Sequence, residues 1–140
     1  MLAKIKCHRD LKRSITYNEE KITKGKAECL EAVNFIKDAP SLTLEDKLAR
    51  FESRTSLHEG AVCNAVHISL NFSSKDEITN EKMVMLANHY MKTIGFEDQP
   101  YLVYRHHDTN HPHAHVVSTN ITAEGKRIQL HEIVKKNPAK

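Results

Sequence analysis

The fold is decided by the stretch from Tyr101 to Val117, which reads YLVYRHHDTNHPHAHVV. Its two ends are rich in β-branched and aromatic residues, which predicts a strand over residues 101–105 and another over residues 115–121. The polar segment HDTNHP between them has the composition of a turn. If the first strand reaches His106 and the second starts near His113, the two should pair as an antiparallel hairpin.

Histidines are concentrated in this hairpin. Of the ten histidines in the chain, five lie from His106 to His115. Side chains alternate along a strand, so His113 and His115 should share one face, and a register with His106 opposite His113 adds a third imidazole. Three neutral imidazoles on a rigid sheet face predict a divalent-metal site that keeps positions open for water or substrate. Asp108 could accept a ring N–H and orient one of these ligands.

A solvated, histidine-rich turn is the alternative interpretation, but it does not explain a His-x-His pair inside a β-branched strand. By parity, His107 faces away from the cluster. His111 lies in the turn, where it should contact substrate or solvent and act at most as a neighbour of the ligands. The remaining histidines are expected to be ordinary core or surface residues: His8, His58, His67, His89 and His131.

The other elements follow from periodicity. Residues 80–94 carry apolar side chains on one helical face, and Gly95 supplies a stop. We expect a weaker helix over residues 27–37 and a short one after Thr43, whose side chain can form a capping box with Asp46. Strict alternation predicts a strand over residues 66–72, and a further strand is expected over residues 2–5. The order predicts an α+β fold, a mainly antiparallel sheet with helices packed on it.

Composition narrows the class of protein. With 39% hydrophobic and 28% charged residues, the 140-residue chain is not a disordered segment. No apolar run approaches the ~20 residues of a membrane span, and the N-terminus lacks a signal peptide, so we expect a cytoplasmic protein without membrane insertion. Three cysteines outside any C-x-x-C pair predict thiols, with neither a disulfide framework nor a cysteine zinc site.

The net charge of +3 is modest, but the first 26 residues hold eight basic and three acidic side chains. Such a segment is either a patch that faces phosphates or a solvated face, and the sequence favours neither.

A longer pattern in the hairpin resembles the histidine motif of relaxases, the mobilization nucleases of conjugative plasmids and integrative elements in the HUH endonuclease superfamily. The pattern is His106-x-Asp108-x-x-His111-Pro112-His113-x-His115. The resemblance extends to a tyrosine motif, YNEEKI at residues 17–22 with KGKA at 24–27, and to a middle block that includes HISLN at 67–71. It covers about residues 3–129.

In relaxases a tyrosine attacks one DNA phosphodiester and forms a 5′-phosphotyrosyl enzyme, and the resemblance gives this role to Tyr17. Elimination agrees, because Tyr90 lies on an apolar helix face and Tyr101 and Tyr104 lie in a predicted strand. A phenol is protonated at neutral pH, so attack requires a nearby cation or base. The alternative for Tyr17 is an exposed amphipathic residue in a loop or first helical turn.

The resemblance also implies a metal on His106, His113 and His115 that holds the scissile phosphate. Imidazole suits several ions; Mn²⁺ or Mg²⁺ is expected, with Zn²⁺ as the alternative. The implied partners are single-stranded DNA at a transfer origin, accessory mobilization proteins and a type IV secretion coupling protein.

Two departures from the family pattern are visible. Asn120 stands where a basic residue is common, and the chain ends early, so residues 1–140 are expected to form a single relaxase-like nuclease domain from the N-terminal part of a longer protein. A non-catalytic DNA-binding or accessory module and a replication-initiator nuclease remain alternatives.

Overall fold

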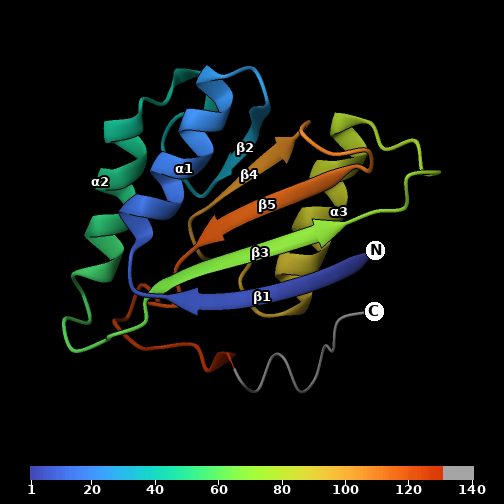
Figure 1. The fold of residues 1–140 in the computed structure, drawn as a ribbon. Coiled ribbons are helices and arrows are strands. Elements are labelled where there is room, and N and C mark those ends of the chain that lie inside the picture. The colour runs from blue at the N-terminus through green and yellow to red at the C-terminus, as the bar shows by residue number, and fades with distance from the viewer. Residues whose placement is uncertain (131–140) are drawn as a thin grey trace.

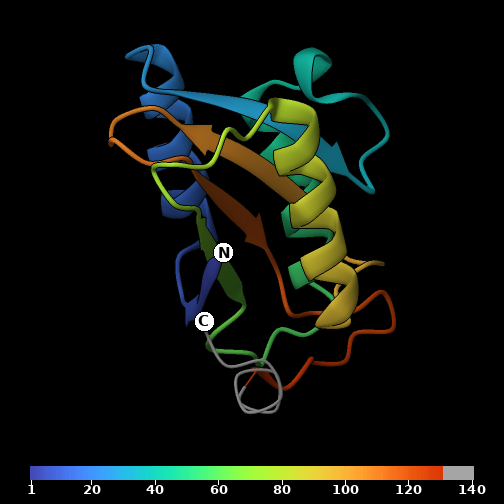
Figure 2. The same ribbon diagram turned by 90° about the vertical axis from the view of Figure 1, so that its right-hand side faces the viewer.

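The computed structural model describes residues 1–130. Its five strands form one antiparallel sheet in the order β1-β3-β5-β4-β2. Helices α1 and α2 cover one face of the sheet and α3 covers the other (Figures 1 and 2). The elements are β1 (Leu2–His8), α1 (Leu11–Thr23), β2 (Ala27–Val33), a 3-10 turn (Ala39–Ser41), α2 (Leu44–Thr55), β3 (Ala65–Asn71), α3 (Asn80–Thr93), β4 (Tyr101–His106) and β5 (His113–Ser118). The expected α+β class is confirmed.

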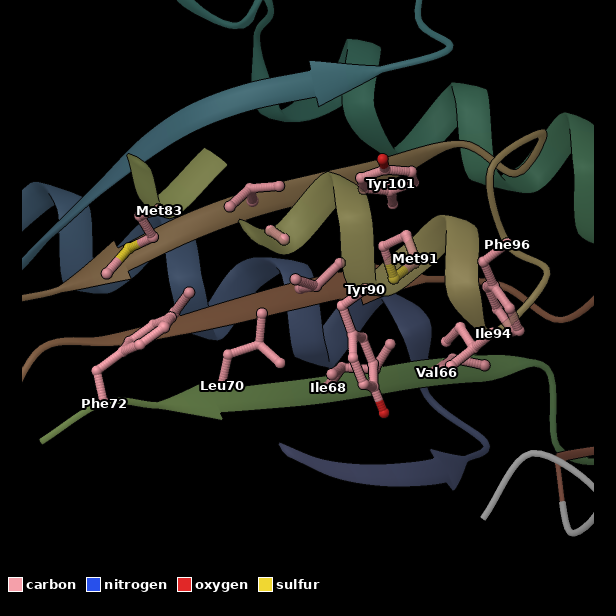
Figure 3. Packing of buried hydrophobic residues seen from close by; sticks show 14 of the residues in the cluster. Val66, Ile68, Leu70, Phe72, Met83, Tyr90, Met91, Ile94, Phe96 and Tyr101 are labelled. Atoms are coloured by element: carbon pink, nitrogen blue, oxygen red, sulfur yellow. The ribbon is translucent and has the colours of Figure 1, made fainter. Parts of the chain in front are cut away.

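The larger core lies between the sheet and α3. Alternate residues of β3, namely Val66, Ile68 and Leu70, are fully buried against this helix, where they meet apolar side chains such as Met83 and Met91 (Figure 3). The predicted strand and helix are therefore confirmed. α3 begins at Thr79, whose side chain accepts a hydrogen bond from the backbone N–H of Lys82. Gly95, at φ +84°, follows its end, a backbone conformation that favours glycine.

A smaller core lies between the other face of the sheet and helices α1 and α2. It is built by Ile15 of α1, Phe51 of α2, and Leu102, Tyr104 and Val117 of the sheet. α2 begins with the predicted capping box between Thr43 and Asp46. Beyond this core, the same face continues along β4 and β5 to His106 and His115.

The prediction of a helix over residues 27–37 is wrong. Residues Ala27–Val33 form the edge strand β2, which pairs with β4 through a bulge between Cys29 and Glu31. Its sequence, AECLEAV, is rich in good helix formers. Pairing with a distant strand overrides that local preference.

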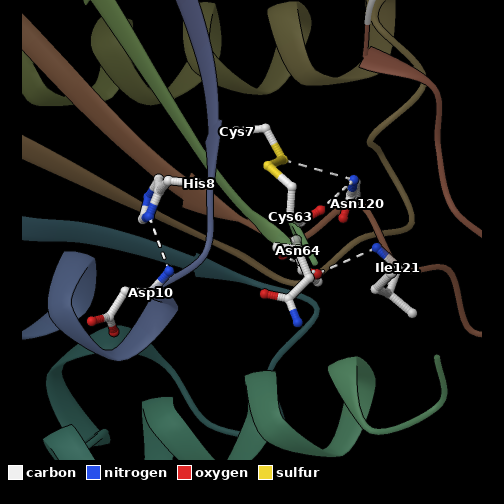
Figure 4. The surroundings of a disulfide bond; sticks show 8 residues. Cys7, His8, Asp10, Cys63, Asn64, Asn120 and Ile121 are labelled. Carbon is white, nitrogen blue, oxygen red and sulfur yellow. Dashed lines mark hydrogen bonds between the residues drawn. A yellow bond between two sulfur atoms is a disulfide. The ribbon is translucent and has the colours of Figure 1, made fainter. Parts of the chain in front are cut away.

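The cysteine prediction is also corrected. Cys7, in β1, and Cys63, just before β3, form a disulfide with their Cα atoms 5.9 Å apart (Figure 4). The two residues are 56 positions apart in the chain, and only the antiparallel pairing of β1 with β3 brings them together, so spacing could not reveal the pair. Cys29 is a free thiol, as expected. None of the helices within residues 1–130 is long and apolar enough to cross a membrane.

Candidate active site

The β4–β5 hairpin has the predicted register, with His106 directly opposite His113 and Tyr104 opposite His115. The three imidazoles converge on the sheet face that α1 covers. Their ligand atoms all lie within 4.8 Å of one another. The ring centroids of His106 and His115 are 4.0 Å apart, and that of His113 lies 5.1 Å from the His115 centroid. These three residues are called the histidine triad below.

The environment keeps two rings of the triad, those of His106 and His115, uncharged at neutral pH. Burial, reinforced by the neighbouring His113, lowers the pKa of His106 from 6.5 to about 4. Burial and the adjacent imidazole of His106 lower the pKa of His115 to about 3. A neutral imidazole offers a lone pair without first losing a proton. The donor set therefore fits a divalent metal ion.

Hydrogen bonds fix which nitrogen carries the proton in two of the rings. The Asn18 amide donates to the carbonyl of Ser14, so its oxygen accepts from Nε2 of His106 at 2.7 Å. The Thr109 hydroxyl donates to a backbone carbonyl and accepts from Nδ1 of His113 at 3.1 Å. A neutral ring has one donor and one acceptor nitrogen. Lone pairs therefore remain on Nδ1 of His106 and Nε2 of His113.

Asp108 sits beside the triad, as predicted, but its strongest contact is a different one. It forms an ion pair with Lys21 of α1, which holds the pKa of the Asp108 carboxyl below its ordinary value. Its other oxygen is 3.7 Å from Nε2 of His113, too far for a hydrogen bond. Asp108 therefore joins the hairpin turn to α1 and places a negative charge next to the triad.

Tyr17 lies in the middle of α1, and not in a loop or a first helical turn. Its side chain is 50% exposed. Its ring centroid is 6.3 Å from that of His106, and the Lys21 ammonium lies 5.6 Å from the ring centroid. The helix itself was not predicted, because its sequence is polar and Ile15 is its one fully buried apolar residue.

The remaining tyrosines, Tyr90, Tyr101 and Tyr104, are all buried. The hydroxyl of Tyr104 donates to Glu19 at 2.8 Å, and Glu19 also accepts from the buried Lys47 of α2 at 2.7 Å. This network ties α1 to the sheet and to α2. It fixes which face of α1 is turned toward the triad.

Part of the basic N-terminal segment lies beside Tyr17. An open groove of about 530 Å³ runs between β1, the start of α1 and β3, and its lining includes Tyr17, Lys6, Arg9 and Arg13. Three cations in one groove beside an exposed tyrosine are suited to phosphate groups. Of the two interpretations of this segment, the phosphate-facing patch is the one that this placement favours.

Several histidines outside the triad also have clear positions. His107 points away from it and contacts Glu28, with 3.0 Å between Nε2 and the carboxylate, as parity predicted. The His111 ring lies 5.7 Å from that of His113. His58 contacts the carbonyl of Gly125. His131 lies outside the described residues.

His67, Asn18 and Thr109 contact the triad, and sequence reasoning missed all three. Nε2 of His67 is 2.7 Å from Nδ1 of His115. Alternation in β3 places His67 on the face opposite Ile68, a signal that was available in the sequence. It becomes informative only once β3 is known to pair with β5.

A protein-family model described as "Relaxase: MobA/VirD2-like, nuclease domain" matches residues 17–139, most of the chain. The chain belongs to this family. The match begins at Tyr17 and contains Lys21, Asp108 and the whole triad. No curated protein and no solved structure matches the chain. Relaxase nuclease domains cleave DNA, bind it as a single strand and generally use a divalent metal, and the histidine triad of this relaxase could hold one.

Proposed function

We propose that this relaxase domain is a cytoplasmic, metal-dependent nickase that cleaves one strand at a transfer origin through a 5′-phosphotyrosyl intermediate on Tyr17, to start conjugative mobilization. One observation carries the proposal. Among the four tyrosines, Tyr17 alone is exposed, and its ring lies 6.3 Å from the ring of His106 in the histidine triad.

In the proposed reaction the Tyr17 hydroxyl oxygen attacks the scissile phosphorus. An O–P bond to tyrosine forms, the P–O3′ bond breaks, and the DNA leaves with a free 3′-hydroxyl, which takes up a proton in place of the one that the phenol loses. The Lys21 ammonium, 5.6 Å from the Tyr17 ring centroid, favours the negative charge that develops on the phenol oxygen.

His106, His113 and His115 would hold the metal, because their ligand atoms converge on one side of the sheet and the rings of His106 and His115 are neutral at pH 7. A bound divalent metal supplies polarisation of the phosphoryl group and stabilises its charge in the transition state. Mn²⁺ or Mg²⁺ is the proposed ion. Asp108 would keep the hairpin turn and α1 together through Lys21, so that Tyr17 stays beside the triad.

The groove lined by Lys6, Arg9 and Arg13 would bind backbone phosphates next to the scissile one. A single strand suits this open surface, because unpaired nucleotides can bend into it while their phosphates meet the cations. Accessory mobilization proteins and a type IV secretion coupling protein are the proposed partners of the DNA-bound form.

The test uses fluorescent single-stranded oligonucleotides that tile the DNA flanking the gene, incubated with the protein and Mn²⁺ or Mg²⁺. We expect an adduct that survives denaturing electrophoresis and is absent from Tyr17→Phe. Tyr90→Phe, which removes a hydroxyl on the α3 side of the sheet, is the matched control and should form the adduct. An adduct that persists in Tyr17→Phe would exclude Tyr17 as the nucleophile.

A further inference from the structure

A fourth imidazole adjoins the triad. His67 of β3 stacks on His115 of β5, with ring centroids 4.8 Å apart and Nε2 of His67 2.7 Å from Nδ1 of His115. The two residues are diagonal neighbours, because the residue directly opposite His115 in β3 is Ser69. At 2.7 Å, the two nitrogens share a hydrogen bond.

That hydrogen bond has two possible directions. If His67 donated from Nε2, the single proton of a neutral His115 would have to lie on its Nε2, and the ring would have no lone pair left for a metal. If His115 donates from Nδ1, its Nε2 keeps a lone pair. His67 then accepts this hydrogen bond through the lone pair on its own Nε2.

We propose that His67 is a positioning residue: it accepts the Nδ1–H of His115 and thereby holds His115 in the tautomer and orientation that present Nε2 as a metal ligand. This inference rests on the metal site proposed above. It completes a pattern, because Asn18 accepts from His106 and Thr109 accepts from His113 in the same way. Each ring of the triad then has its own acceptor, and acceptors of this kind fix ligand orientation and raise ligand basicity.

Nuclear magnetic resonance on protein labelled with ¹⁵N-histidine tests the direction of the bond, with Zn²⁺ as a diamagnetic probe. In the Zn²⁺-loaded protein we expect a proton on Nδ1 of His115 and none on Nε2 of His67, with His67 free of metal. A proton on Nε2 of His67, or a Zn²⁺ ion bound by His67 itself, would overturn the proposal. This measurement uses the wild-type chain, so it does not depend on the folding of a variant.

Two substitutions test the consequence for affinity by calorimetry with Zn²⁺. His67→Leu removes the acceptor and should weaken binding by about 10–100-fold. His67→Gln places an amide oxygen near the position of Nε2 and should restore the affinity to within about threefold of wild type. His89→Leu removes an exposed imidazole of α3, on the other side of the sheet from the triad, and should bind Zn²⁺ as the wild type does.

The outcomes separate this inference from the proposal on which it rests. If the wild type binds Zn²⁺ and His113→Ala abolishes binding while His67→Leu leaves it unchanged, the role of His67 is overturned and the metal site stands. If the wild type does not bind a divalent metal, the metal site itself is overturned.

Discussion

The two faces of β3 and β5 carry opposite kinds of side chain from neighbouring positions in the chain. Toward α3, Ile68 and Val116 are fully buried among apolar groups. Toward α1, the residues directly before them, His67 and His115, form a hydrogen-bonded imidazole pair. Alternation along a strand thus lets adjacent residues serve packing on one face and chemistry on the other. Stability and metal binding should therefore be separable by mutation.

The largest effect is expected from the double substitution His113→Ala plus His115→Ala. It removes two imidazoles from the side of the sheet that faces α1, called the chemical face below. Loss of two of three ligands should abolish metal binding and reduce DNA cleavage on the order of 10³-fold or more, because a bound metal contributes several kcal/mol of charge stabilisation. Calorimetry with Mn²⁺ and the adduct assay measure the two losses. His89→Ala, on the exposed side of α3, is the control. Metal binding that survives the double substitution would rule out the triad as the site.

The converse change, Ile68→Ala, acts on the side of the sheet that packs against α3, called the packed face below. Removing a fully buried side chain should lower the free energy of unfolding by about 2–5 kcal/mol. Urea titration measures this loss, and it should be greater than the loss caused by the double histidine substitution. In protein that remains folded, the affinity for Mn²⁺ should equal that of the wild type. A clear fall in that affinity would show that the two faces are coupled.

A smaller effect should appear as a pH dependence of stability to which the buried imidazoles on the α1 side of the sheet contribute. Burial lowers the pKa of His67 and His106 to about 4 and that of His115 to about 3, against 6.5 in an unfolded chain. As the pH falls from about 7 to 4, the unfolded chain binds protons that the folded chain does not. The free energy of unfolding of the metal-free protein should therefore decrease over this range.

Urea titrations at a series of pH values, in the presence of a chelator, measure this decrease. His115→Gln removes one of the three groups and should make the dependence shallower, whereas Ile68→Ala should shift the whole curve downward without changing its slope. Parallel curves for His115→Gln and the wild type would contradict the assignment of the pH dependence to the buried imidazoles.

The sequence predicted the parts of this relaxase domain that local patterns determine. Alternation identified β3, helical periodicity identified α3, and composition identified the β4–β5 hairpin, whose observed register is the one considered, with His106 opposite His113. It failed where the structure depends on distant partners. β2 has the residues of a helix and becomes a strand by pairing with β4. The polar helix α1 is held in place by contacts such as that of Glu19 with Tyr104.

The candidate site likewise has parts that local sequence patterns predict and parts that depend on distant segments. Parity predicted that His113 and His115 share a face, and the register considered for the hairpin, with His106 opposite His113, added the third ring. The contacts of Asn18 with His106 and of His67 with His115 could not be predicted. They require the order of strands in the sheet and the face that α1 turns toward it, and neither follows from local sequence.

The central claim is that Tyr17 is the residue that becomes joined to DNA, and mapping the adduct tests it most directly. After reaction with single-stranded DNA and Mn²⁺, the adduct is digested with a nuclease and then with trypsin, and the modified peptide is identified by mass spectrometry. Cleavage after Arg13 and Lys21 releases the peptide SITYNEEK, which contains Tyr17 and no other tyrosine. We predict a nucleotide phosphate on the Tyr17 oxygen of this peptide; the same modification on a peptide that carries Tyr90, Tyr101 or Tyr104 would contradict the account.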